Sequence, residues 1–160
     1  MAQPTPLHHA AARAGAAFTE EAGSAVPAHF GDPVKEYQQA RDGCAVFDRS
    51  HRGKLELTGP EAARFLHNLT TQDVLGLPPG EGREAFALTV KARVVANFLV
   101  FHVQSPRGES SYWLNLPPGA SEATLKHLDR HRISERVEFT DRSHDFAQLH
   151  VAGPRAAAVV

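Results

Sequence analysis

The sequence predicts an α+β fold in which an antiparallel sheet carries flanking helices, related to split-βαβ folds. Two observations indicate this class. A strand pattern over residues 54–58 leads into a helical pattern, and three strand patterns in a row then precede the next helix. This order differs from the regular strand–helix alternation of a parallel sheet. A second strand, Gly-Pro and helix start near the end of the chain repeats the first in outline.

The first strand and helix are the most clearly patterned elements. Leu55 and Leu57 alternate with polar residues, as in a half-buried strand. Thr58 and Glu61 have the spacing of a capping box, so we expect them to cap the helix that follows. That helix carries an apolar stripe formed by Ala62, Phe65, Leu66 and Leu69.

Turn and cap residues define the other elements. Asp32-Pro33 starts a helix, and Gly43 ends it where a left-handed cap is usual. The strand over residues 94–103 is apolar on both alternating faces, which favours a central position covered on both sides. Ser121 is expected to cap a further helix. Two short strands close the pattern, near residues 137–139 and 148–152.

An internal repeat links the two ends of the pattern. LELTGPEAARFL at residues 55–66 recurs as LHVAGPRAAAVV at residues 149–160, with five identities among the twelve positions. The tetrapeptide DRSH precedes each copy, at residues 48–51 and 141–144. The repeat favours a duplicated supersecondary unit. We therefore expect the second unit to be truncated from about residue 147, and these 160 residues to be the N-terminal part of a longer architecture.

Composition excludes several classes of function. A net charge of −1 argues against binding to nucleic acid or to an anionic membrane. His127 and His131 have helical spacing but no third ligand at a recognisable spacing, so no metal site is expected. The single cysteine, Cys44, excludes an internal disulfide and fits a reducing cytoplasm. The sequence has neither a membrane-length apolar run nor a signal-peptide pattern, so we expect a cytoplasmic protein.

Asp48, Ser50 and His51 invite interpretation as a catalytic triad, which we reject. A nucleophilic serine also needs an oxyanion site, and nothing in the sequence supplies one. A short Asp-x-Ser-His run is more often a turn held by its Asp and Ser side chains, and its recurrence at Asp141 favours that interpretation.

The assembled motifs resemble those of a known family. FDRSH, G-K-L-E-L-T-G-P-E-A, T-x-D-V, a Gly-rich loop and a long apolar strand follow one another between residues 47 and 103. Upstream, V-P-A-H-F-G and E-Y-x-x-A-R match as well. Together they resemble the glycine-cleavage T-protein (aminomethyltransferase) superfamily from about Leu7 onward. The resemblance implies a folate-binding fold of duplicated α+β units around a central pocket, completed in that family by a C-terminal barrel.

Within that superfamily, the sequence is more similar to the YgfZ-type folate-binding branch. The transferases carry a paired Asp-Asp on the long apolar strand, and the aligned residues here are Ala96 and Asn97. An amide cannot stabilise a developing cationic nitrogen as a carboxylate does, so binding is expected rather than transfer. The branch is associated with maintenance of iron–sulfur enzymes, including those that modify tRNA. Its hallmark K-G-C-x-x-G-Q-E is absent from these residues.

The resemblance implies folate-binding residues and a domain plan. We expect residues 1–24 to form a flexible Ala-rich segment and residues 25–160 to form part of the folate-binding domain. Asn97 is either a core amide or a ligand contact, and Arg52 is a candidate for the glutamate tail of folate. The expected folate-binding residues are Arg52, Phe86, Asn97 and Phe101.

Three hypotheses of function follow. The first is a YgfZ-type protein that binds tetrahydrofolate or another folate and supports iron–sulfur enzymes, which are then its protein partners. The second is a tetrahydrofolate-dependent aminomethyltransferase whose acid comes from elsewhere. The third is a scaffold or RNA-associated module that keeps the fold without folate.

Overall fold

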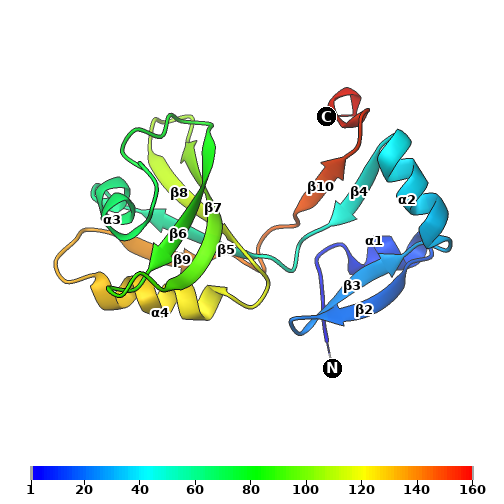
Figure 1. Cartoon of the computed structure of the whole chain (residues 1–160), viewed down its shortest axis with the longest axis horizontal. Helices are drawn as coiled ribbons and strands as arrows, with labels where there is room; N and C mark the ends of the chain where they lie inside the picture. The colour runs from blue at the N-terminus through cyan, green and yellow to red at the C-terminus, as the bar shows by residue number, and fades with distance from the viewer. Residues whose placement is uncertain (1, 160) are drawn as a thin grey trace. The chain divides into compact units, whose positions relative to one another are not determined.

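A computed structural model describes residues 2–159 of the chain. The chain divides into two compact units (Figure 1). Unit 1 combines Met1–His51 with His144–Val160, and unit 2 is the continuous stretch Arg52–Ser143. The division differs from the expected boundary near residue 24, because the chain leaves unit 1 after the first DRSH and returns to it within the second.

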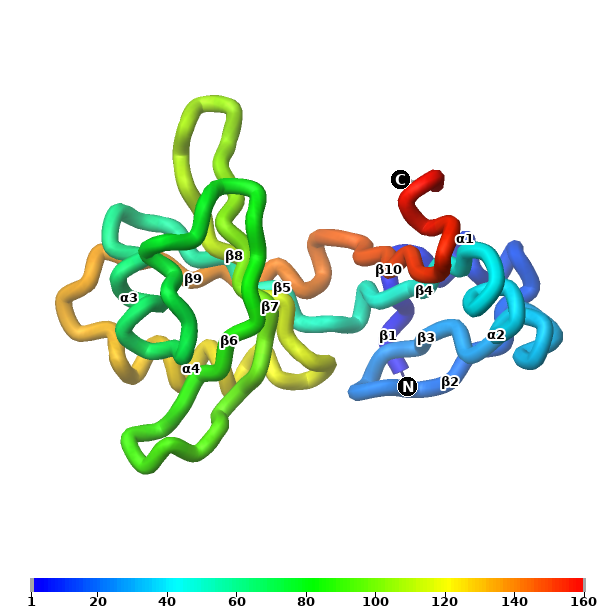
Figure 2. Tube along the Cα trace, turned by 45° about the horizontal axis from the view of Figure 1, so that its top comes forward, coloured from blue at the N-terminus to red at the C-terminus, as the bar shows by residue number. Residues whose placement is uncertain are grey.

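Unit 2 is the predicted antiparallel sheet with helices. Its five strands lie in the order β6-β7-β8-β5-β9, and every neighbouring pair is antiparallel. The turns that flank the long β7 lie at its opposite ends (Figure 2). The elements of unit 2 are β5 (Gly53–Thr58), α3 (Ala62–Leu69), β6 (Gly82–Leu88), β7 (Val94–Gln104), β8 (Ser110–Leu116), α4 (Ser121–His131) and β9 (Glu138–Asp141).

The core of unit 2 lies between one face of this sheet and the two helices. Leu55 and Leu57 are fully buried, which confirms the predicted strand alternation. The helical stripe is confirmed too, since Phe65 and Leu66 of α3 join the same core cluster as Leu128 of α4. Burying each such side chain contributes about 1.5–3 kcal/mol, so this core accounts for much of the stability of unit 2.

The predicted caps of both helices are wrong. Strand β5 continues through Thr58, so α3 begins only at Ala62 and has no side-chain cap. The Glu61 carboxylate instead accepts the backbone N–H of Arg136 at 2.8 Å, and this bond lowers the pKa of Glu61. Helix α4 begins at Ser121 itself, whose hydroxyl lies 3.2 Å from the hydroxyl of Ser143.

Strand β7 is an inner strand, paired with β6 and β8, but it is covered on one face only, so the predicted double cover is wrong. Phe98 and Val100 point into the core and are almost fully buried. The alternate residues are apolar yet exposed: Leu99 is 41%, Phe101 37% and Val103 44% exposed. Apolar composition on both faces predicted a cover that the described residues do not supply.

Unit 1 contains two small sheets and two helices. The N-terminal segment expected to be flexible forms β1, α1 and β2. Gly43 ends α2, but its φ of −138° is not the predicted left-handed cap. The elements of unit 1 are β1 (Gln3–Pro4), α1 (His8–Arg13), β2 (Ala17–Glu21), β3 (Ser24–His29), α2 (Pro33–Asp42), β4 (Ala45–Asp48), β10 (Leu149–Ala152) and the 3-10 helix η1 (Ala156–Ala158). The sheets have the orders β1-β3-β2 and β10-β4.

The two DRSH tetrapeptides form the same turn. Asp48 accepts the backbone N–H of Ser50 at 2.8 Å, and Asp141 accepts that of Ser143 at 2.8 Å. The Ser50 hydroxyl accepts the N–H of Gln148 at 3.0 Å, and the Ser143 hydroxyl accepts that of Lys54 at 3.1 Å. No triad is formed, because the Ser50 hydroxyl accepts from Gln148 and His51 faces Glu21, with His51 Nε2 3.2 Å from Glu21 Oε2.

Candidate functional site

The uncovered side of the five-stranded sheet in unit 2 carries a group of aromatic, apolar and amide side chains. We call this group the open face. Cross-strand register fixes its membership, because residues directly opposite each other point to the same side of a sheet. On β6, β7 and β8 the open face includes Gly82, Glu84, Phe86, Asn97, Leu99, Phe101, Val103, Ser111, Trp113 and Asn115, and the register of β5 adds Lys54 and Glu56 opposite Asn115 and Trp113.

The sequence-predicted residues meet on the open face. Phe86 of β6 lies directly opposite Asn97 of β7. Asn97 is exposed, which leaves its amide accessible and makes the core-amide interpretation wrong. Phe101 lies directly opposite Trp113 of β8, so two aromatic side chains are cross-strand neighbours. Arg52, just before β5, reaches the same face through the side chain of Asn115.

Arg52 and Asn115 form a short contact at one side of the open face. Arg52 Nε donates to Asn115 Oδ1 at 2.6 Å. Lys54 lies directly opposite Asn115, is only 6% exposed, and donates from Nζ to the carbonyl oxygens of Arg52 at 3.0 Å and of Ser143 at 3.1 Å. These bonds hold the backbone of Arg52 and place two cationic residues beside the aromatic pair. Glu56, directly opposite Trp113 on this face, is paired with Arg142 at 2.9 Å, so the part of the open face beside Arg52 suits an anionic group.

Gly82 determines how Phe101 lies. The two residues are directly opposite across β6 and β7. A Cβ built on Gly82 would come within 2.4 Å of the Phe101 ring. Only glycine leaves room for the ring to lie across the β6 backbone there.

A loop over residues 70–76 pairs with the outer edge of β6. Thr71 N donates to Phe86 O at 3.0 Å, and Phe86 N donates to Thr71 Oγ1 at 3.1 Å. Gln72 Nε2 donates to Glu84 O at 3.0 Å. Phe86 is therefore fixed by this loop on one side and by β7 on the other.

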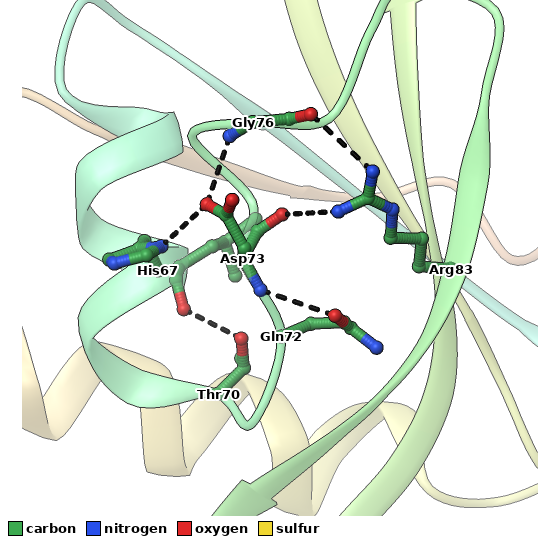
Figure 3. Close-up of polar contacts among 7 residues, drawn as sticks. His67, Thr70, Gln72, Asp73, Gly76 and Arg83 are labelled. Carbon is green, nitrogen blue, oxygen red and sulfur yellow. Dashed lines mark hydrogen bonds and ion pairs between the residues drawn. The ribbon is translucent and has the colours of Figure 1, made fainter.

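The same loop is held together by Asp73 (Figure 3). Asp73 Oδ1 accepts the N–H of Gly76 at 2.9 Å and lies 3.2 Å from Nδ1 of His67 on α3. Arg83 of β6 donates to the Asp73 carbonyl at 3.2 Å. The T-x-D-V motif thus ties α3, the loop and β6 together, which makes its contribution to the site indirect.

Sequence reasoning missed Trp113, Asn115, Lys54 and Glu84. Trp113 and Asn115 alternate along β8 with the buried Tyr112 and Leu114, a period-2 pattern that could have identified them. Glu84 and Lys54 could not be found this way, because their places depend on which strands pair.

The described residues support neither a metal site nor a second site for an anionic ligand. Among residues 2–159 no group of three or more His, Cys, Asp or Glu side chains could hold a metal ion. A polar hollow of about 670 Å³ at the β5–α3 turn includes Glu56 and Glu109 in its lining, so it repels anions. No helix in the described part of the chain is long and apolar enough to cross a membrane.

Comparison with known proteins places this geometry in a family. The family model described as the GCVT N-terminal domain matches residues 7–160. The chain belongs to this family. The T-protein-like α+β fold expected from the sequence motifs is thereby confirmed at the level of the superfamily.

Individual relatives agree with this assignment. The aminomethyltransferase of Chloroherpeton thalassium is 30% identical over 156 residues, which cover 98% of this chain and 42% of the relative. The aminomethyltransferase of Deinococcus deserti is 31% identical, with 98% and 43% coverage. The chain thus spans less than half the length of these curated relatives. The crystal structure of the glycine cleavage system aminomethyltransferase T from Bartonella henselae has a TM-score of 0.84 at 24% identity, covering 99% of this chain and 43% of that one.

Proposed function

We propose that this chain binds a reduced folate, tetrahydrofolate or a close relative, on the open face of unit 2. The observation that carries the proposal is the opposition of Phe86 to Asn97 beside the pair formed by Phe101 and Trp113. Aromatic rings flanked by a few polar groups suit a flat heterocycle, which stacks on the rings and hydrogen-bonds at its edge.

The chemistry of folate matches the two sides of the open face. The amide of Asn97 offers both a donor and an acceptor, which complements the amide-like edge of a pterin. Arg52 lies toward the other side, where its hydrogen bond to Asn115 orients the guanidinium. A carboxylate of the glutamate tail is the group that this arginine would pair with.

Calorimetric titration of tetrahydrofolate into the purified chain tests the proposal. We expect measurable binding that weakens about fivefold or more in Phe101→Ala and in Asn97→Leu, because each removes a direct contact. Val90→Ala is the matched control, since Val90 is 98% exposed in the β6–β7 turn. Absence of binding to the folded wild type would refute the proposal, and so would equal losses in all three variants.

Aminomethyl transfer is the second candidate, favoured by the names of the relatives and by one further observation. Glu84 lies directly opposite Leu99, so its carboxylate is on the open face, one diagonal step from Asn97. Under the aminomethyltransferase hypothesis, Glu84 supplies the carboxylate that is missing at Ala96 and Asn97. If the chain catalyses transfer from an aminomethyl donor to tetrahydrofolate, Glu84→Gln should lower kcat at least tenfold, whereas transfer unaffected by Glu84→Gln would rule out this role.

The narrower YgfZ-type role, in iron–sulfur enzyme maintenance or tRNA modification, stays a prediction. Its support is the presence of Ala96 and Asn97 where the transferases carry two acids. Wild-type binding of tetrahydrofolate without turnover is the result expected for this role. The scaffold hypothesis instead expects a folded chain with no folate affinity.

A further inference from the structure

A serine and a histidine of unit 2 meet on the side of the sheet that faces the helices, opposite to the open face. His102 of β7 is 8% exposed, and its ring stacks on that of Tyr112 with 4.7 Å between the ring centroids. His102 Nε2 lies 2.9 Å from the hydroxyl oxygen of Ser110 on β8, and Nδ1 lies 2.8 Å from the carbonyl oxygen of Leu77. The imidazole is thus held between one hydroxyl and one carbonyl.

Leu77 determines which ring nitrogen of the neutral imidazole carries the proton. A carbonyl oxygen only accepts hydrogen bonds, so Nδ1 of His102 is protonated and donates to Leu77. Nε2 therefore keeps its lone pair and accepts the hydroxyl proton of Ser110. A histidine in this arrangement can act as a general base toward a serine nucleophile, with the carbonyl in the orienting position that a carboxylate holds in a catalytic triad.

The backbone of the histidine is fixed as well as its ring. His102 N donates to Glu81 O at 3.0 Å, and His102 O accepts from Gly80 N at 2.8 Å. The loop before β6 thus holds the main chain at both groups while its Leu77 carbonyl holds the ring. The base is therefore preorganised, and one rotation of the Ser110 side chain is the remaining freedom of the pair.

Ser110 opens onto the polar hollow of about 670 Å³ at the β5–α3 turn. It is exposed and lines this hollow together with Gly59, Glu109 and Tyr112. The ladder between β5 and β8 ends at the pair of Leu57 with Tyr112, so the two strands separate beside Ser110. The hollow therefore gives a small molecule access to the serine, while the histidine behind it stays buried.

Two hydrogen-bond donors lie beside the serine hydroxyl. Ser105 N donates to Glu109 O at 2.8 Å across the β7–β8 hairpin, and the pairs of an antiparallel ladder alternate. The N–H of Ser110 therefore points away from β7, to the side where β5 has separated from β8. Tyr112 is 7% exposed, and among residues 2–159 no group hydrogen-bonds its hydroxyl. A buried hydroxyl without a partner is costly, so this donor is suited to a ligand in the hollow.

We propose that Ser110 and His102 act as nucleophile and general base in the hydrolysis of small, positively charged carboxylic esters. Ser110 Oγ attacks the ester carbonyl carbon while His102 Nε2 takes the hydroxyl proton. The bond from this carbon to the alkoxy oxygen then breaks, and the imidazolium gives its proton to the leaving alcohol. Water repeats both steps on the acyl-serine, which releases the carboxylic acid and restores Ser110. The Ser110 N–H and the Tyr112 hydroxyl are the donors for the oxyanion.

The charge of the hollow selects the class of ester. Glu109 lines the hollow and is exposed, and within residues 2–159 no cationic side chain pairs with it. Glu56 also lines the hollow but is neutralised by Arg142 at 2.9 Å. One uncompensated carboxylate thus favours a cationic substrate over an anionic one. Folate binding does not bear on this activity, because Ser110 and the open face lie on opposite sides of the sheet.

A fluorophosphonate with a short alkyl chain tests the nucleophile in the full chain. It should label Ser110, as tandem mass spectrometry of the tryptic peptide identifies, and Ser110→Ala should lose this label. His102→Gln should slow labelling about 100-fold, since general base catalysis contributes about 10²–10⁴-fold. Thr58→Ala is the matched control, because Thr58 lines the same hollow but faces the opposite side of the sheet from His102, and it should be labelled as fast as the wild type.

Three outcomes of this labelling overturn the proposal. They are an unlabelled wild type, label at another residue in place of Ser110, and equal slowing in Thr58→Ala and His102→Gln. Far-UV circular dichroism checks that each variant is folded. Because Ser110 is exposed, Ser110→Ala decides the matter even if His102→Gln does not fold. Ser110→Ala should also keep the wild-type affinity for tetrahydrofolate, which separates this activity from the open face.

Acetylcholine and neohexyl acetate, in which carbon replaces the charged nitrogen, test the class of ester. Titration of the released acid at constant pH follows both reactions. An exposed carboxylate contributes up to about 1 kcal/mol, so kcat/KM should be about threefold higher for acetylcholine, and Glu109→Gln should remove this preference while neohexyl acetate is still hydrolysed. Hydrolysis that persists in Ser110→Ala, or no hydrolysis of either ester by the wild type, overturns the activity. A preference for neohexyl acetate, or one for acetylcholine that Glu109→Gln keeps, overturns the assignment of charge.

Discussion

The ring of Phe101 lies across Gly82, with 2.4 Å between its Cδ1 and the position that a Cβ on Gly82 would take. The two residues belong to different strands and were brought together by the register of β6 and β7. The Phe101 ring fits at this position because Gly82 has no side chain. Gly82 therefore shapes the open face although it has no functional group.

Gly82→Ala should therefore impair folate binding more than stability. The added methyl group forces the Phe101 ring away from β6, and loss of one well-placed aromatic contact corresponds to about 1 kcal/mol, or a fivefold rise in Kd. Titration of tetrahydrofolate measures the affinity, and urea denaturation measures the stability. Glu81→Ala, at the preceding exposed position, is the control; an unchanged Kd in Gly82→Ala would show that the ring does not contact the ligand.

Arg52→Gln should discriminate between folates with and without the glutamate tail. A charge-assisted hydrogen bond contributes about 1.5–3 kcal/mol, so affinity for tetrahydrofolate should fall about tenfold or more. Affinity for tetrahydropterin, which has no tail, should stay the same. Calorimetry with both ligands makes the comparison, and equal losses for the two would contradict the assignment of Arg52 to the tail.

Asn115→Ala extends this test to the residue that orients Arg52. Its Oδ1 accepts from Arg52 Nε at 2.6 Å, so its removal should reproduce part of the loss for tetrahydrofolate. A positioning role further predicts that Arg52→Gln and Asn115→Ala are not additive in the double variant. Additive losses would mean that the two side chains act separately.

Ser50→Ala should destabilise the chain. We also expect that Ser50 is not a nucleophile. Ser50 is 3% exposed, and its hydroxyl accepts the N–H of Gln148 at 3.0 Å, so truncation removes a hydrogen bond between the two halves of unit 1. The expected loss is about 1–3 kcal/mol in urea denaturation. Labelling by a fluorophosphonate should be the same in Ser50→Ala as in the wild type, and labelling that Ser50→Ala removes would revive the rejected triad.

How far the sequence predicts this fold depends on whether the determining contact is local. The alternation of Leu55 with Leu57 and the stripe containing Phe65 are local patterns, and both are confirmed. The cap assigned to Ser121 failed because a competing partner, Ser143, is distant in sequence. Local spacing cannot reveal such competition.

The candidate site shows the same limit. Motif resemblance identified Phe86, Asn97 and Phe101, which register brings to one face, but their ligand contacts stay predictions. We expected the outer face of β7 to be covered because its side chains are apolar. Composition shows that a side chain is apolar, but it does not show whether another element covers it. That depends on the rest of the fold. Gly82 is visible in the sequence, yet its role depends on a partner strand that the sequence does not specify.

Stability should fall as the pH drops below about 6.5, because of His127. Its pKa lies below the ordinary value of 6.5, first because burial disfavours the imidazolium and then because His131 and Arg130 repel it. The unfolded chain therefore binds a proton at a higher pH than the folded chain, and stability rises with pH between the two pKa values and levels off above 6.5. Urea denaturation at several pH values from 5 to 8 measures this slope.

His127→Gln should flatten that slope, because the amide does not titrate. The rings of His127 and His131 are 4.6 Å apart, so the variant also removes the unfavourable Coulombic effect of His131 on a protonated His127. His9→Gln, on the exposed surface of unit 1, is the control and should leave the slope unchanged. If His127→Gln keeps the wild-type slope while His9→Gln loses it, the acid sensitivity arises in unit 1 and the assignment to α4 is wrong.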